Sequence, residues 1–136
     1  MEPAVRFALS GAPTDVALAR HVLRVTLADW DLGGDVADTA VLLLSEVVTN
    51  AVRHSPGPAE VEVALSETPG LRICVHDRGG DRPLPGGRPL PGGRQHEVPL
   101  ASEGGRGLFL LDALARSWGS RHEPGNGKQV WFELGA

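Results

Sequence analysis

The stretch LLLSEVVTNAVRHS constrains this chain most, because an apolar run of helical length carries three polar side chains at even spacing. Glu46, Asn50 and His54 follow one another at steps of four. An α-helix advances about 100° per residue, so these steps drift by only about 40° and align a carboxylate, a carboxamide and an imidazole in one stripe. An amide in mid-helix competes with the backbone and adds no stability. The stripe is therefore either ordinary solvated surface or part of a site.

Composition narrows the class of protein. The 136 residues, 41% hydrophobic and 22% charged, predict a single domain over 1–136. A net charge of -4 without a basic run argues against direct nucleic-acid binding. Neither a signal peptide nor a membrane-length apolar run is present, so a cytoplasmic protein is expected. Cys74, the single cysteine, excludes an internal disulfide and is expected to be a small core residue.

Hydrophobic periodicity predicts an α/β chain. Strands are expected at 4–9, 60–65 and 71–76, with a final pair within 117–124 and 128–134. Helices are expected at 15–30, at 36–54 with Asp35 as the N-cap, and at 108–115 after a glycine cluster. The apolar residues expected to face the core and its edges around the polar stripe are Leu42, Leu43, Val47, Val48, Ala51 and Val52.

Residues 78–107 have a different composition, rich in glycine, proline and arginine. The hexapeptide RPLPGG occurs at 82–87 and again at 88–93. Proline and glycine this dense do not form a strand or a helix, so a long loop is predicted. Loops of this length inside a domain are lids or disordered segments, and the composition fits both.

Two glycine-bearing motifs flank this loop. Asp77-Arg78-Gly79-Gly80 follows an apolar strand, where a carboxylate can accept a hydrogen bond from an exocyclic amine, although Asp and Gly also favour plain turns. The second motif, Glu103-Gly104-Gly105-Arg106-Gly107, opens the third predicted helix. Glycines there expose N–H donors at the positive end of the helix dipole, which suits phosphate, but they also occur as a flexible entry to a core helix.

The order of these motifs resembles the GHKL ATPase superfamily, whose nucleotide-binding unit is the Bergerat fold. The resemblance runs from about residue 7 to 134 and, through SEVVTNAVRHS and GKQVWFEL, is greatest to bacterial anti-sigma-factor serine/threonine protein kinases. It implies a two-layer sandwich, with a mixed, mostly antiparallel sheet covered on one face by about three helices. The loop at about 78–107 would be the ATP lid.

The resemblance also implies roles for individual residues, with ATP and Mg²⁺ as cofactors. Asn50 would hold the Mg²⁺ that bridges the phosphates, and Glu46 would be the general base. Asp77 would bind the adenine amino group, while Gly79 permits its approach. The remaining implied positions are backbone donors to phosphate at Gly105 and Gly107, a charge partner at Arg106, and a peripheral or capping role for His54.

The implied function is an ATP-dependent serine kinase that sequesters a sigma factor and phosphorylates an anti-anti-sigma protein, in a family whose members often form homodimers. The alternative is a catalytically silent ATP-binding regulatory module. Relatives commonly carry a threonine that supports the adenine-binding aspartate where this chain has Gln129, and the duplicated lid is unusual. These departures favour the module, and Glu46 favours the kinase. A sensor histidine kinase is rejected because there is no room for a phosphoacceptor hairpin, and a ligand-free α/β domain would need three accidental motifs.

Overall fold

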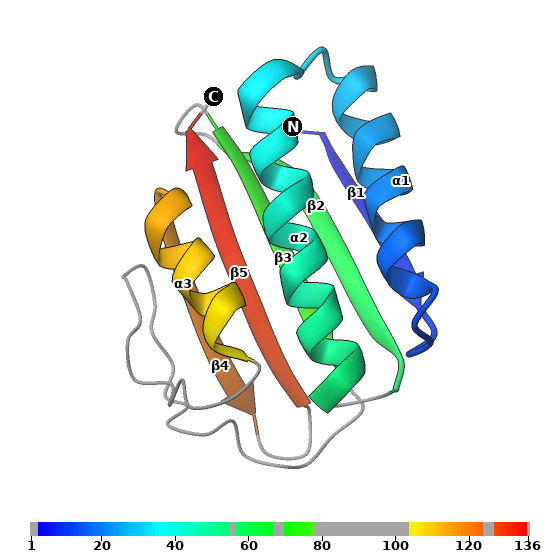
Figure 1. Cartoon of the computed structure of the whole chain (residues 1–136). Helices are drawn as coiled ribbons and strands as arrows, with labels where there is room; N and C mark the ends of the chain where they lie inside the picture. Colours follow the sequence, from blue (N-terminus) through cyan, green and yellow to red (C-terminus); the bar gives the residue numbers. More distant parts are fainter. Residues whose placement is uncertain (1–2, 55–56, 67–69, 78–103, 124–126, 136) are drawn as a thin grey trace.

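The computed structural model describes residues 3–54, 57–66, 70–77, 104–123 and 127–135. Five strands and three helices follow one another within these ranges (Figure 1). Their bounds are β1 Ala4–Leu9, α1 Asp15–Asp29, α2 Gly34–His54, β2 Ala59–Ser66, β3 Gly70–Asp77, α3 Gly104–Leu114, β4 Ser117–Glu123 and β5 Gly127–Gly135.

The strands form one open sheet in the order β1-β2-β3-β5-β4. All four neighbouring pairs are antiparallel. The three helices lie on one face of this sheet, with α2 along its middle and α1 and α3 on either side (Figure 1). This two-layer α/β arrangement confirms the predicted fold class.

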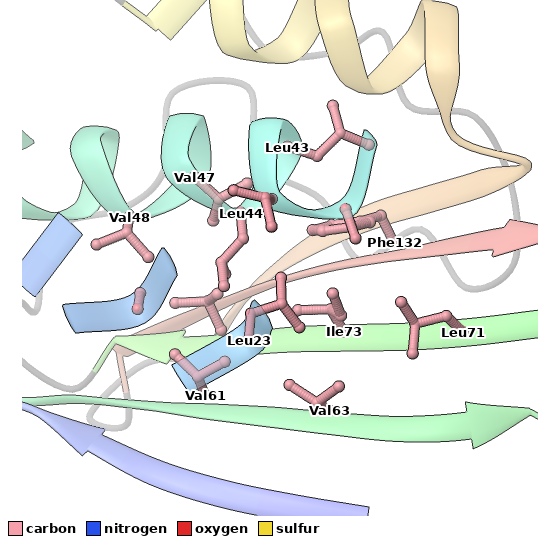
Figure 2. Close-up of a cluster of buried hydrophobic side chains, with 14 of the residues drawn as sticks. Leu23, Leu43, Leu44, Val47, Val48, Val61, Val63, Leu71, Ile73 and Phe132 are labelled. Atoms are coloured by element: carbon pink, nitrogen blue, oxygen red, sulfur yellow. The ribbon is translucent and has the colours of Figure 1, made fainter. Parts of the chain in front are cut away.

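The core lies between the sheet and α2 because alternate residues of each strand point toward the helices. Figure 2 shows leucine and valine side chains of α2 packed against apolar side chains of the sheet. Phe132 and Trp118 are the largest side chains that are fully buried. The labelled members of this cluster are Leu23, Leu43, Leu44, Val47, Val48, Val61, Val63, Leu71, Ile73 and Phe132.

Three details of the helices differ from the sequence-based expectations. Helix α2 begins at Gly34, so Asp35 lies inside its first turn, where its charge favours the helix dipole, and is not an N-cap. Leu42 is 41% exposed, because it lies four residues before Glu46 on the polar stripe. Helix α3 begins at Gly104 and not at residue 108, so the glycine cluster forms its first turn. Of the lid predicted at about 78–107, residues 78–103 lie outside the described residues, and 104–107 belong to α3.

The sheet face that the helices leave uncovered carries charged pairs. Arg6 Nε and Glu62 Oε2 are 3.1 Å apart, and the Arg72 guanidinium lies 4.7 Å from the centre of the Trp131 ring. Cys74 is half-buried on this face opposite Trp131, so the expectation of a core position was wrong. Burial raises the pKa of the Cys74 thiol, although nearby Arg72 opposes this.

The turn between β1 and α1 is held by a buried carboxylate. Asp15 accepts hydrogen bonds from the Gly11 backbone N–H at 2.7 Å and from the Ser10 hydroxyl at 3.1 Å. Gly11 has a φ of +98°, and a Cβ there would lie 2.6 Å from the backbone nitrogen of Gly57. Two loops far apart in sequence therefore meet backbone to backbone, beside the end of α2.

A Gly11→Ala variant is expected to lose about 2 kcal/mol or more of unfolding free energy, because alanine disfavours this φ and its methyl group meets fixed backbone. Chemical denaturation followed by tryptophan fluorescence measures the loss. Gly33→Ala is the matched control, since a Cβ at Gly33 meets nothing within 4 Å. Equal stability of the two variants would contradict the close contact.

The first and last strands fix where the chain enters and leaves the fold. Ala4 pairs with Ala64 near the end of β2, and Gly135 pairs with Gly70 at the start of β3. Both ends therefore lie at the sheet end opposite Asp77, as the N and C marks in Figure 1 show. Of the described helices, none has the length and apolar character needed to cross a membrane.

Candidate functional site

The segments that carry the predicted site residues come together at one end of the sheet. Helix α2 ends at His54, just before β2 begins at Ala59, and Ala59 pairs with Asp77 at the end of β3. Asp77 also pairs with Lys128 at the start of β5. The start of α3 lies toward this same end, beside the C-terminal half of α2 (Figure 1). We call this region the motif end.

Asp77 is the buried acidic residue of the motif end. It follows Val75 and Ile73 at the spacing of two that directs a strand's side chains to one face, here the face covered by the helices. Only 2% of Asp77 is exposed. A carboxylate buried this deeply costs free energy unless it is paired, so a position like this is typical of a functional acceptor.

Glu46 and Asn50 lie at the border of the buried face of α2. Both are half-buried, whereas Val47, Val48 and Ala51 are buried beneath them. The hydroxyls of the residues just before each of them, Ser45 and Thr49, form hydrogen bonds within the helix. Ser45 donates to the carbonyl of Val41 and Thr49 to that of Ser45, each at 2.7 Å. The Glu46 carboxylate and the Asn50 amide each follow one of these hydroxyl residues, at the border of the buried face.

The glycine motif supplies the first turn of α3. Gly105, Arg106 and Gly107 are among its first four residues, whose backbone N–H groups have no partner inside a helix. The first turn carries no acidic residue, so the positive end of the helix dipole is not neutralised within it. Trp118 of β4 donates to Asp112 at 3.4 Å, which connects the C-terminal half of α3 to the sheet.

Three predicted positions lie outside what the structure describes. They are Gly79 and the side chains of Arg106 and His54. The motif end therefore brings together Asp77, the Glu46–Asn50 stripe and the backbone of the α3 first turn.

The expectation for Gln129 was wrong in its geometry. Gln129 pairs with His76, so it belongs to the uncovered face and not beside Asp77. The residue directly opposite Asp77 is Lys128, which sequence reasoning missed. The signal was present, because Val130, Phe132 and Leu134 point to the core and a period of two places Lys128 on their face.

Ser120 of β4 is a second polar residue that sequence reasoning missed. It pairs with Val130 and is 1% exposed, so its hydroxyl is buried on the helix-covered face. The Ser120 Oγ atom has no hydrogen-bond partner within the part of the chain that the structure describes. No pattern in SWGSRHE singled this serine out, because inward alternation with Trp118 appears only once the register is known.

Comparison with known proteins identifies the family and the fold. A family model for the histidine kinase-like ATPase domain matches residues 9–134, which confirms the predicted superfamily. The fold is similar to a crystal structure of the RsbU and RsbW domains of Rv1364c from Mycobacterium tuberculosis, with a TM-score of 0.70 and 22% identity over 98% of this chain. The match spans 32% of that longer chain. No curated protein matches the sequence. From residue 9 to residue 134, the chain belongs to the histidine kinase-like ATPase domain family.

Proposed function

We propose that this protein binds Mg²⁺·ATP at the motif end and transfers the γ-phosphoryl group to a serine of a partner protein. The observation that carries the proposal is the meeting of a buried acceptor, a polar helix stripe and a helix N-terminus in a member of this ATPase family. Each matches a different part of the Mg²⁺·ATP complex: the buried acceptor matches the base, the helix stripe matches the metal, and the helix N-terminus matches the phosphates.

The donors and acceptors at the motif end fit these cofactors. Asp77 accepts from the adenine amino group, and Gly79 allows the ring to approach. The N–H groups of Gly105 and Gly107 donate to phosphate oxygens, with Arg106 as a charge partner. Asn50 holds Mg²⁺ through its side-chain oxygen, since Mg²⁺ prefers oxygen ligands and commonly combines one or two protein ligands with phosphates and water. Bound Mg²⁺ would neutralise phosphate charge during transfer.

Glu46 acts as the general base in the proposed reaction. It lies one helical turn before Asn50 and is half-buried at the same border of α2. The Glu46 carboxylate accepts the proton of the serine hydroxyl as the serine oxygen bonds to the γ-phosphorus and the bond from that phosphorus to ADP breaks. The products are phosphoserine and ADP.

The partners are proposed from the sequence resemblance and from the fold likeness to a chain that includes an RsbW domain. We assign the target serine to an anti-anti-sigma protein and the regulated partner to a sigma factor, which sets the site of action in the bacterial cytoplasm. A homodimer is the assembly expected from the resemblance. The second candidate, a catalytically silent ATP-dependent module, is favoured by the duplicated RPLPGG segment in the predicted lid.

Isothermal titration of the protein with ATP, with and without Mg²⁺, tests the shared core of both candidates. We expect saturable binding that requires Mg²⁺ and prefers ATP to GTP, because Asp77 accepts from an amino group that guanine lacks at position 6. Failure to bind either nucleotide would refute both candidates and leave the fold as a protein-interaction scaffold.

A further inference from the structure

Lys128 lies in an unusual position for a cation. It is directly opposite Asp77 in the antiparallel pair of β3 and β5, so both side chains belong to the helix-covered face. Directly opposed residues have Cβ atoms about 4.5–5.5 Å apart, close enough for a long side chain to reach its neighbour. Lys128 is half-buried and is the only lysine in a chain whose other basic residues are arginines.

A cationic residue opposite Asp77, on the same face of the sheet, would change what this end of the sheet can recognise. The Asp77 carboxylate only accepts hydrogen bonds, and the Lys128 ammonium only donates them. An arginine here would engage both carboxylate oxygens with its planar fork, whereas a lysine offers three donors on a flexible stem and can serve two acceptors together. The opposed residues Asp77 and Lys128 therefore supply one acceptor and one donor on the same face of the sheet.

We propose that Lys128 recognises the adenine base together with Asp77. The Lys128 ammonium group donates a hydrogen bond to the ring nitrogen N1, and the Asp77 carboxylate accepts one from the 6-amino group. The edge of adenine has this pattern, a donor at the 6-amino group next to an acceptor at N1. The inference rests on the proposed ATP site and assigns to it a specificity-determining residue.

A purely structural role for Lys128 would be an ion pair that neutralises Asp77. The two roles predict different things about the ligand. If Lys128 is purely structural, replacing it changes the affinity for every purine nucleotide. If Lys128 binds the base, it contributes to affinity only when the base has an acceptor at N1. Deleting that one atom from the ligand separates them.

The test compares ATP with 1-deaza-ATP, in which a C–H group replaces N1, by isothermal titration in Mg²⁺. The parent protein should bind ATP about 10- to 100-fold more tightly than 1-deaza-ATP, the range expected for a hydrogen bond to a charged group. In Lys128→Met, ATP binding should weaken by a similar factor and the preference should disappear. Lys128→Gln, which keeps an N–H donor, should recover part of it.

Gln129→Met is the matched control, because Gln129 is the next residue of β5 but lies on the uncovered face, and its preference for ATP should equal that of the parent. Equal binding of the two nucleotides by the parent would overturn the proposal without any variant. An undiminished preference in Lys128→Met would also overturn it.

Purine riboside triphosphate, which lacks the 6-amino group, separates this inference from the proposed function. Weaker binding of this analogue together with equal binding of ATP and 1-deaza-ATP would leave the ATP site standing and refute the role of Lys128 alone. Absence of ATP binding by the parent would refute the ATP site and this inference together.

Discussion

A Glu46→Ala variant is expected to lose phosphotransfer to a serine-bearing anti-anti-sigma partner by about 10²- to 10⁴-fold, the usual contribution of a positioned general base. Mg²⁺·ATP binding should persist, because the proposed contacts with base, metal and phosphates come from other residues. The fold should also persist, since Glu46 is only half-buried on the stripe side of α2 and alanine is a better helix former. Transfer of labelled γ-phosphate to the partner gives the rate, and calorimetry gives the affinity.

Asp38→Ala is the control for this experiment. Asp38 lies near the start of the same helix, far from Glu46 along its axis, and its ion pair with Arg24 at 3.5 Å is exposed. Exposed pairs contribute little to stability, so transfer by this variant should match the parent. Normal transfer by Glu46→Ala would refute the base assignment. A parent that binds Mg²⁺·ATP but transfers nothing would select the silent module.

An Asn50→Ala variant is expected to lose the Mg²⁺-dependent part of ATP binding. Removing an outer-shell partner of a metal site typically costs about 10- to 100-fold in affinity, and a direct ligand should cost at least as much. The free energy of unfolding without nucleotide should stay equal or rise, because alanine replaces an amide that competes with the helix backbone. Titrations with and without Mg²⁺, paired with denaturant unfolding, measure the two quantities.

A weaker Mg²⁺-dependent ATP affinity together with a higher free energy of unfolding in Asn50→Ala would identify Asn50 as a residue that serves binding and not stability. Asp38→Ala again serves as the control on the same helix and should retain the Mg²⁺ dependence of the parent. An Asn50→Ala protein whose ATP affinity responds to Mg²⁺ as the parent does would exclude Asn50 as the metal ligand.

Much of the fold could be predicted because its signals are local. Alternation in β2 and β3 and the stripe of α2 are properties of short windows, and the predicted elements match the structure closely. Boundaries were less predictable where two local preferences compete. The glycines of α3 favour a loop through their backbone freedom, yet Gly104, Gly105 and Gly107 form the first turn of the helix.

Site geometry depends on strand register, which local patterns do not carry. Asp77 and the α2 stripe were identified from residue type and order, but the neighbour of Asp77 comes from the pairing of β3 with β5, more than forty residues later in the chain. Gln129 was chosen by analogy, and a shift of one residue moves a side chain to the other face of a sheet. Applying that alternation to 128–134 would have selected Lys128.

The location of the two chain ends has a consequence for how this domain can be joined to others. The start of β1 and the end of β5 lie at the same end of the sheet. From Lys128 to Gly135, β5 spans roughly 24 Å. A linker attached to either chain terminus would therefore start at the end of the sheet farthest from the motif end. Neighbouring modules on both sides could therefore be attached at the same end of the sheet, and a circularly permuted chain with its ends joined there should leave the motif end accessible.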